Sequence, residues 1–196
     1  MRTETPTEAW RVGWPPTGAS SEWHSDAAEV DFDAVDPEEI VEGIAIPDRI
    51  RMDDLLTRYA TAIDDRDWAL LDSVFTRDAH LDYRSAGGVE GSYPEVRRWL
   101  AEVLPIFELT QHLVVNREFR GAADGVHVRS CFLNVNRLEV EGKPWLFTVG
   151  GRYHDRMVNT ANRWRIARRI EQTLWWDNPM PGLPESPPPV PELLDY

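Results

Sequence analysis

The hydrophobic pattern of this chain changes its period near Pro105, and that change limits the folds that the chain can adopt. Before Pro105, apolar residues recur every three to four positions, as they do on one face of an α-helix. After it, apolar and polar residues alternate, as they do on a half-buried β-strand. Helices followed by consecutive hairpin-linked strands indicate an α+β domain, with the helices packed on one face of the sheet.

The first half predicts three helices and one short strand. The helices are expected over residues 47–64, 67–75 and 91–104, and the strand over 79–85. Pro47 and Asp48 are typical of a helix start, and Ser92 can cap the third helix. The apolar stripe of the first helix consists of Ile50, Leu55, Leu56, Tyr59, Ala60 and Ile63.

The second half predicts four long strands joined by hairpin turns. The strands are expected over residues 110–121, 125–142, 143–159 and 162–177. The links GAAD, EGKP and NTAN are typical of such turns, and Gly150 and Gly151 would permit a bend in the third strand. We therefore expect a cone-shaped α+β barrel, in which three N-terminal helices pack on a curved, mostly antiparallel sheet. Its apolar interior would suit a small hydrophobic ligand.

Both ends of the chain differ in composition from the middle. Residues 1–45 carry eleven acidic residues and two arginines, which gives −9 of the formal net charge of −13. The last residues are rich in proline, with Leu193, Leu194 and Tyr196 as possible anchors. We therefore expect an acidic, irregular extension over 1–45, a cone domain over 46–178 and a Pro-rich tail over 179–196.

Charge and cysteine content exclude several classes of protein. A strongly negative chain is not expected to bind nucleic acid or an anionic membrane. No apolar run is long enough for a membrane span, and no basic segment followed by an apolar one indicates a signal peptide. The single cysteine, Cys131, cannot form an internal disulfide. A cytoplasmic location is the simplest expectation.

Sequence motifs for bound cofactors are absent. His24, His80, His127 and His154 lack the spacing of metal ligands, and there is no HExxH motif. No GxSxG nucleophile motif occurs either. We therefore expect neither a metal nor a cofactor, and acid–base chemistry by side chains remains.

Three sequence segments carry a resemblance to a known family. RYATAIDDRDWALLDSVFTRDAHLDYRS, the later TQH, and GGRYHDRMV with RWRIARR resemble the SnoaL-like branch of the nuclear transport factor 2-like superfamily, over residues 47–177. The first two segments are most similar to scytalone dehydratase, and they also resemble bile acid 7α-dehydratase and hexachlorocyclohexane dehydrochlorinase. The resemblance indicates the fold better than the reaction, because one fold hosts many chemistries.

The resemblance implies a catalytic Asp64–His112 dyad. The histidine would remove a proton from carbon, and the aspartate would orient the histidine. Tyr59 matches a helix tyrosine of the bile acid enzyme, and Tyr83 matches a tyrosine of scytalone dehydratase. Asn136 stands near the position of a second histidine or aspartate. Its amide can bind a substrate oxygen but cannot transfer a proton at neutral pH.

Each of these residues also has a structural explanation. A lone strand histidine at position 112 is more often bonded to backbone, and Tyr59 and Tyr83 fit equally well as core aromatics. Asp64 lies at the edge of the buried stripe, whereas Asp65 and Asp67 suit a turn or a cap. The further candidates for substrate contact are Asn134, Asn136, Trp99, Phe132, Phe147 and Trp175.

We expect a cofactor-independent lyase of the dehydratase type, which abstracts a proton next to a carbonyl of a small hydrophobic ring compound, as in polyketide or steroid metabolism. A polyketide cyclase or a ketosteroid-type isomerase could use the same dyad. A non-catalytic small-molecule binding protein also stays open. Cone folds often pair through the outer face of the sheet, so a homodimer or homotrimer is expected.

Overall fold

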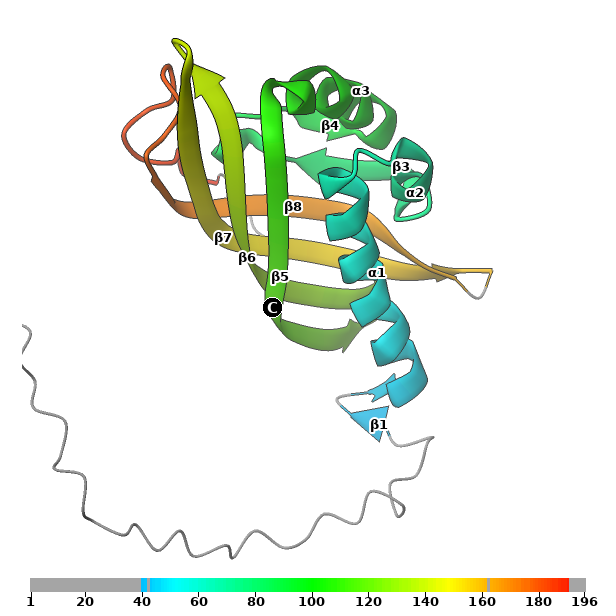
Figure 1. Ribbon diagram of the computed structural model, residues 1–196. Coiled ribbons are helices and arrows are strands. Elements are labelled where there is room, and N and C mark those ends of the chain that lie inside the picture. The colour runs from blue at the N-terminus through cyan, green and yellow to red at the C-terminus, as the bar shows by residue number, and fades with distance from the viewer. Residues whose placement is uncertain (1–39, 42, 162, 191–196) are drawn as a thin grey trace, which may run out of the picture. The chain divides into compact units, whose positions relative to one another are not determined.

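The computed structural model describes residues 40–41, 43–161 and 163–190 (Figure 1). In chain order the elements are β1 (Ile40–Val41), β2 (Ile44–Ala45), α1 (Ile46–Asp64), α2 (Trp68–Leu71), β3 (Phe75–Asp82), a 3-10 turn (Arg84–Ala86), β4 (Glu90–Ser92), α3 (Tyr93–Val103), a second 3-10 turn (Leu104–Ile106), β5 (Phe107–Ala122), β6 (Gly125–Val140), β7 (Lys143–Thr160) and β8 (Arg163–Asp177). The predicted α+β class is confirmed. The expectation of an irregular segment up to residue 45 was wrong at its end, because β1 and β2 pair as a short hairpin.

Helix α1 follows its prediction closely. Pro47 lies in the first turn, where backbone N–H groups have no partner within the helix, so its missing N–H costs no hydrogen bond. The buried face differs at two positions: Ile50 is 56% exposed and Met52 is completely buried instead, and Ala62 rather than Ala60 is fully buried. The helix ends at Asp64, and Arg66 beyond it adopts a positive φ of 56°. Asp64 is therefore presented at the C-terminal end of the helix.

The second predicted helix is shorter than expected. Asp67 caps α2 by accepting a 2.9 Å hydrogen bond from the backbone N–H of Leu70. The helix stops at Leu71, and the strand β3 begins at Phe75, so the expectation of helix up to residue 75 was wrong. Phe75 instead pairs with Ile166 of β8, and the carbonyl of Val74, in the turn before β3, accepts a hydrogen bond from the N–H of Ile166. Valine and phenylalanine favour strands, and sheet pairing here overrides the helical spacing.

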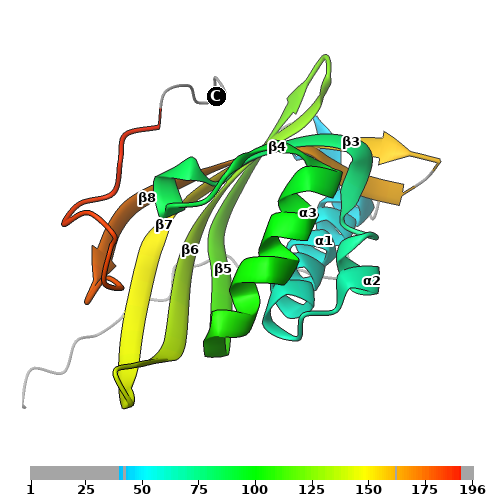
Figure 2. The same ribbon diagram turned by 90° about the horizontal axis from the view of Figure 1, so that it is seen from above.

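The sheet has six strands in the order β4-β3-β8-β7-β6-β5. All neighbours are antiparallel except β3 and β8, which are parallel. The four long hairpin strands and their turns are confirmed, and Glu141 and Gly142 supply the positive φ values that a tight turn needs. Figure 2 shows the sheet curving around α1 and α3, which cover its concave face.

Two bulges interrupt the pairing of β7 with β8, and both affect the concave face. The register shifts between Arg156 and Met157, and again between Gly150 and Gly151. At Gly151 a side chain could not fit, because an added Cβ would lie 2.2 Å from the Gln172 carbonyl oxygen. The predicted bend at the two glycines is therefore present as a bulge.

The segment after β8 runs across the ends of the neighbouring strands. Trp145 Nε1 donates to the Asn178 carbonyl at 3.0 Å, and Trp176 Nε1 donates to the Glu185 carbonyl at 3.1 Å. These two bonds hold residues 178–185 against β7 and β8. The predicted anchors at 193, 194 and 196 lie outside the described residues.

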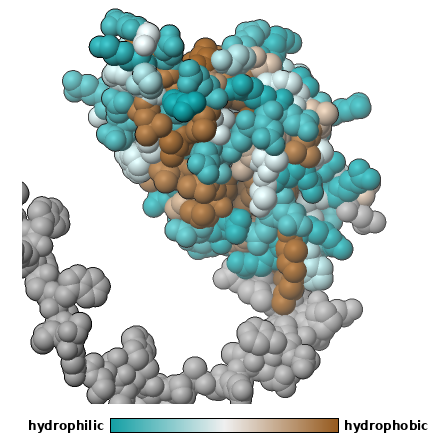
Figure 3. Space-filling view, in the orientation of Figure 1, coloured by the Kyte–Doolittle hydropathy of each residue, from teal (hydrophilic) through white to brown (hydrophobic). Residues whose placement is uncertain are grey.

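Apolar side chains also gather on the surface over the long strands (Figure 3). The large apolar residues of β5 and β7 that are more than 40% exposed are Leu109, Leu113, Val115 and Leu146. The expected homodimer or homotrimer stays a prediction. No helix among the described residues is long and apolar enough to cross a membrane.

Candidate active site

A cavity of about 160 Å³ lies under α1 and α3, on the concave face of the sheet. Apolar walls come from both helices, from β7 and from the segment after β8, including Trp99, Phe147, Met180 and Leu183. A cavity of roughly 150 Å³ can hold a benzene molecule. The polar side chains in its wall are Tyr59, Tyr83, His112, Asn134, Asn136, Tyr153 and Glu171. The space therefore suits one small ring with a few polar substituents.

Asp64 holds His112 through two hydrogen bonds. Asp64 Oδ1 lies 2.6 Å from His112 Nδ1, and Asp64 Oδ2 accepts from the backbone N–H of His112 at 2.8 Å. The side chains are 22% and 9% exposed, respectively. A carboxylate can only accept, so Nδ1 carries the proton and Nε2 presents a lone pair. Because His112 lines the cavity, this lone pair is available to a bound molecule.

A buried cation lies beneath the aromatic wall. The Arg169 guanidinium is centred 3.9 Å from the ring of Tyr59 and 4.1 Å from the ring of Tyr153. Two 2.7 Å hydrogen bonds join it to the carboxylate of Asp155, and both side chains are fully buried. Burial alone would lower the pKa of Arg169, but the Asp155 charge raises it well above its usual value. The cation is therefore permanent, and it fixes the positions of the two rings.

Three buried tyrosines keep their protons. Burial raises the pKa values of Tyr59, Tyr83 and Tyr153 well above the ordinary value. The hydroxyl oxygens of Tyr59 and Tyr83 lie 3.2 Å apart and share a hydrogen bond. These hydroxyls can donate a hydrogen bond to a substrate oxygen, but they do not act as phenolates.

Glu171 is the acid of the cavity. It is 6% exposed, and burial raises the pKa of its carboxyl to about 8, against the lowering effects of the Arg169 charge and a hydrogen bond from Thr173. The carboxyl is therefore mostly protonated near neutral pH. A neutral carboxylic acid in an apolar cavity can give a proton to a departing group.

The structure brings most of the predicted residues together. His112, Tyr59, Tyr83, Asn134, Asn136, Trp99 and Phe147 line the cavity, with Asp64 directly behind His112. Phe132 does not line it; its ring stacks on Tyr153 with centroids 4.4 Å apart. Trp175 also lies outside the cavity, because it is 47% exposed and packs over Gly150.

Sequence reasoning missed Glu171, Tyr153 and the Arg169–Asp155 pair. Charged residues such as those in RRIEQT are more often found on a solvated strand face than on an interior one. One signal was present, since Asp155 and the arginines at 168 and 169 fall opposite each other across the expected hairpin. Within the described residues, no group of three His, Cys, Asp or Glu side chains could hold a metal ion.

Comparisons with known proteins agree with this fold. A family model described as the SnoaL-like domain matches residues 45–170. The uncharacterized proteins Rv2910c of Mycobacterium tuberculosis H37Rv and Mb2934c of Mycobacterium bovis are each 39% identical over 126 residues, which is 64% of this chain and 85% of theirs.

Solved structures share the fold at low sequence identity. A candidate scytalone dehydratase from Novosphingobium aromaticivorans has a TM-score of 0.63 at 18% identity, covering 76% of this chain and 97% of the other. The hexachlorocyclohexane dehydrochlorinase LinA-type3 from Novosphingobium barchaimii has a TM-score of 0.60 at 20% identity, covering 73% and 97%. At such identities the likeness establishes the cone fold and nothing finer.

Proposed function

The chain belongs to the SnoaL-like family, and from this premise we propose that it is a lyase of the dehydratase type, acting on a small hydrophobic ring compound. The observation that carries the proposal is the placement of a held histidine and a neutral carboxylic acid in one cavity. His112 and Glu171 both line that cavity, on strands β5 and β8. A base and an acid in one apolar space are what an elimination requires.

The substrate would be a ring ketone with a hydroxyl group on the β-carbon. His112 Nε2 removes the proton from the carbon next to the carbonyl, and the electron pair of that C–H bond forms the new C=C bond. The C–O bond to the hydroxyl breaks, and Glu171 gives its proton to the departing oxygen. One water molecule is released, and nothing is oxidised or reduced. The imidazolium and the carboxylate regain their neutral forms by exchanging a proton with solvent.

The dyad explains why His112 suits the role of base. Once His112 carries two protons, its positive charge faces the Asp64 carboxylate at 2.6 Å. This contact stabilises the imidazolium that proton abstraction creates. The second bond, to the backbone N–H of the same residue, holds the Asp64 carboxylate in place beside the ring. General bases of this kind contribute about 10²–10⁴-fold to rate.

Hydroxyl and amide groups would hold the substrate oxygens. The hydroxyls of Tyr59 and Tyr83 can donate to the carbonyl oxygen as negative charge develops on it. Asn134 Nδ2 lies 3.5 Å from the Tyr153 hydroxyl, and its Oδ1 is buried without a hydrogen-bond partner among the described residues. Such an acceptor suits the hydroxyl of a ligand, which would supply the missing bond.

The test separates proton abstraction from loss of water. The protein is incubated in D₂O with a panel of cyclic 3-hydroxy ketones, and NMR follows deuterium exchange at the α-carbon while ultraviolet absorbance follows the conjugated enone. His112→Gln should abolish both signals. Glu171→Gln should abolish enone formation but retain exchange.

The control is His80→Gln, because His80 is an exposed histidine paired with Glu90 at 3.0 Å. This variant should behave as wild type. Turnover by folded His112→Gln at the wild-type rate would remove the base assignment. A ligand that binds in the cavity but is recovered unchanged, without exchange, would favour a binding protein instead.

A further inference from the structure

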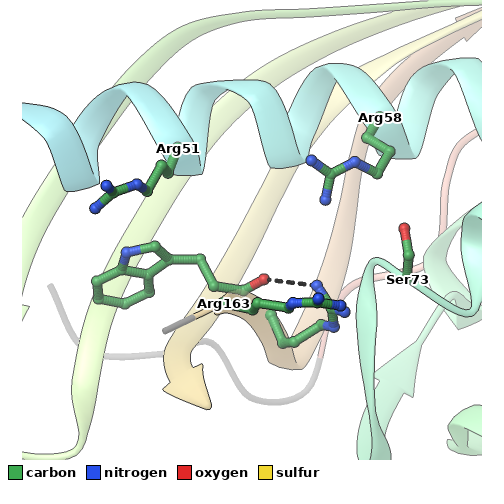
Figure 4. Close-up of a pocket in the computed structure, with 6 residues that line it drawn as sticks. Arg51, Arg58, Ser73 and Arg163 are labelled. Carbon is green, nitrogen blue, oxygen red and sulfur yellow. Dashed lines mark hydrogen bonds between the residues drawn. The ribbon is translucent and has the colours of Figure 1, made fainter. Parts of the chain in front are cut away.

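A second cleft shares no lining residue with the cavity described above. It has a volume of about 380 Å³ and is lined by Arg51, Arg58, Ser73, Arg163, Trp164 and Arg165. Figure 4 shows Arg51 and Arg58 projecting from one side of α1 toward the first residues of β8. Four guanidinium groups thus surround one cleft, in a chain whose formal net charge is −13.

Little negative charge balances these arginines. Asp48 Oδ1 accepts from Arg51 Nη1 at 2.8 Å and from Trp164 Nε1 at 2.9 Å. In the part of the chain that the structure describes, Arg58, Arg163 and Arg165 form no ion pair. Burial lowers the pKa of Arg165, and the positive charges of Arg58 and Arg163 lower it further. The cleft therefore concentrates uncompensated positive charge.

An unused hydrogen-bond donor lies in the same cleft. Ser73 lies in the turn between α2 and β3, and its hydroxyl oxygen is buried without a partner among the described residues. Buried hydroxyl groups in folded proteins nearly always have a partner. Because Ser73 lines the cleft, an anion bound there would supply one. This observation is independent of the arginine charges.

We propose that this cleft binds a diphosphate group, either free or carried on a larger molecule. Guanidinium groups match phosphate oxygens with pairs of parallel hydrogen bonds. Three arginines without ion pairs call for an anion with more than one negative charge. Residues 51 and 58 are two helical turns apart, about 10 Å along the axis of α1. The donors therefore follow the length of the cleft, which fits an elongated anion better than a single phosphate.

The proposal is tested by calorimetric titration of the full chain. Inorganic pyrophosphate is one probe and ADP is the other, with sodium chloride at matched ionic strength as the reference. Arg58→Gln and Arg165→Gln should each weaken binding about tenfold or more, because each removes a charged hydrogen-bond donor. Arg137→Gln is the matched control, since it removes the same charge from an exposed arginine that pairs with Glu108 elsewhere. It should change affinity less than about twofold.

Two results would overturn the proposal. One is that neither probe gives heat beyond the salt reference. The other is that Arg58→Gln and Arg137→Gln weaken binding equally, which would indicate attraction to overall charge alone. If circular dichroism shows that Arg165→Gln does not fold, Arg163→Gln, at an exposed residue of the same cleft, takes its place. The ratio of the two probe affinities distinguishes a free diphosphate from one carried on a nucleoside.

Discussion

Glu171→Gln is expected to change how stability depends on pH, and this prediction needs no knowledge of the substrate. The folded-state pKa of Glu171 is about 8, against an ordinary value of 4.5. Between these values the folded protein keeps a proton that the unfolded chain loses. The free energy of unfolding of the wild type must therefore fall as pH rises through this window, by at most about 1.4 kcal/mol per pH unit. The glutamine variant has no such proton and lacks this contribution.

The expected size follows from the two pKa values. Between about pH 5 and about pH 8, the wild type should lose roughly 3 to 4 kcal/mol relative to the variant. Urea unfolding of both proteins, followed by the fluorescence of the nine tryptophans, measures this difference at each pH. Glu102→Gln, on the exposed face of α3, controls for the loss of a negative charge. A difference between wild type and Glu171→Gln that stays constant over this range would refute the assignment of a buried, proton-bearing carboxyl.

Three further substitutions test how the site is supported. Asp155→Asn leaves the buried Arg169 without its partner charge, so unfolding in urea should show a loss of about 3–5 kcal/mol; a loss below about 1 kcal/mol would contradict it. Gly151→Ala places a methyl group 2.7 Å from the Phe132 ring and closer still to backbone, and a fall in the thermal midpoint is expected by calorimetry. An unchanged midpoint would mean that the backbone at the bulge shifts to make room for the methyl group. Ser85→Ala removes the hydroxyl that accepts from a β8 backbone N–H at 2.9 Å, and should reduce stability by about 1–3 kcal/mol in the urea assay, whereas no loss would indicate that water replaces it.

The helices and strands were predictable because each has a continuous pattern of its own. The alternation of apolar and polar residues over 125–142 predicted β6 (Gly125–Val140). Its side chains alternate between buried and less buried positions almost throughout. The hydrophobic pattern gave a wrong prediction where helical spacing competes with pairing to a distant strand. Val74 and Phe75 keep the helical spacing of the preceding residues, yet Phe75 pairs with β8 and the Val74 carbonyl bonds to the same strand. Local propensity could not decide there, because the partner strand comes about ninety residues later.

The part of the polar site on β8 could not be predicted, for a geometric reason. Counting back from the β7–β8 turn without a bulge would pair Asp155 with Arg168. The bulge next to Met157 adds one residue to β8, so Asp155 pairs with Arg169 instead. A shift of one residue exchanges the two faces of a strand, and with it the residues that point inward, including Glu171. No sequence pattern around Ala167 predicts that extra residue. The dyad depended on no such count, since Asp64 ends a helix and His112 lies in the regularly paired stretch of β5, between its two register shifts.

Some of the residues that line the cavity lie beyond the segment that the family model matches. The matched domain ends at residue 170, one position before Glu171, while Met180 and Leu183 close the cavity further along the chain. On the proposed mechanism, homologues that share the matched segment can keep the histidine and its aspartate while differing at position 171 and in the residues that close the cavity. We therefore expect that exchanging residues 171–185 between homologues changes which ligands the cavity accepts and leaves the Asp64–His112 pair intact.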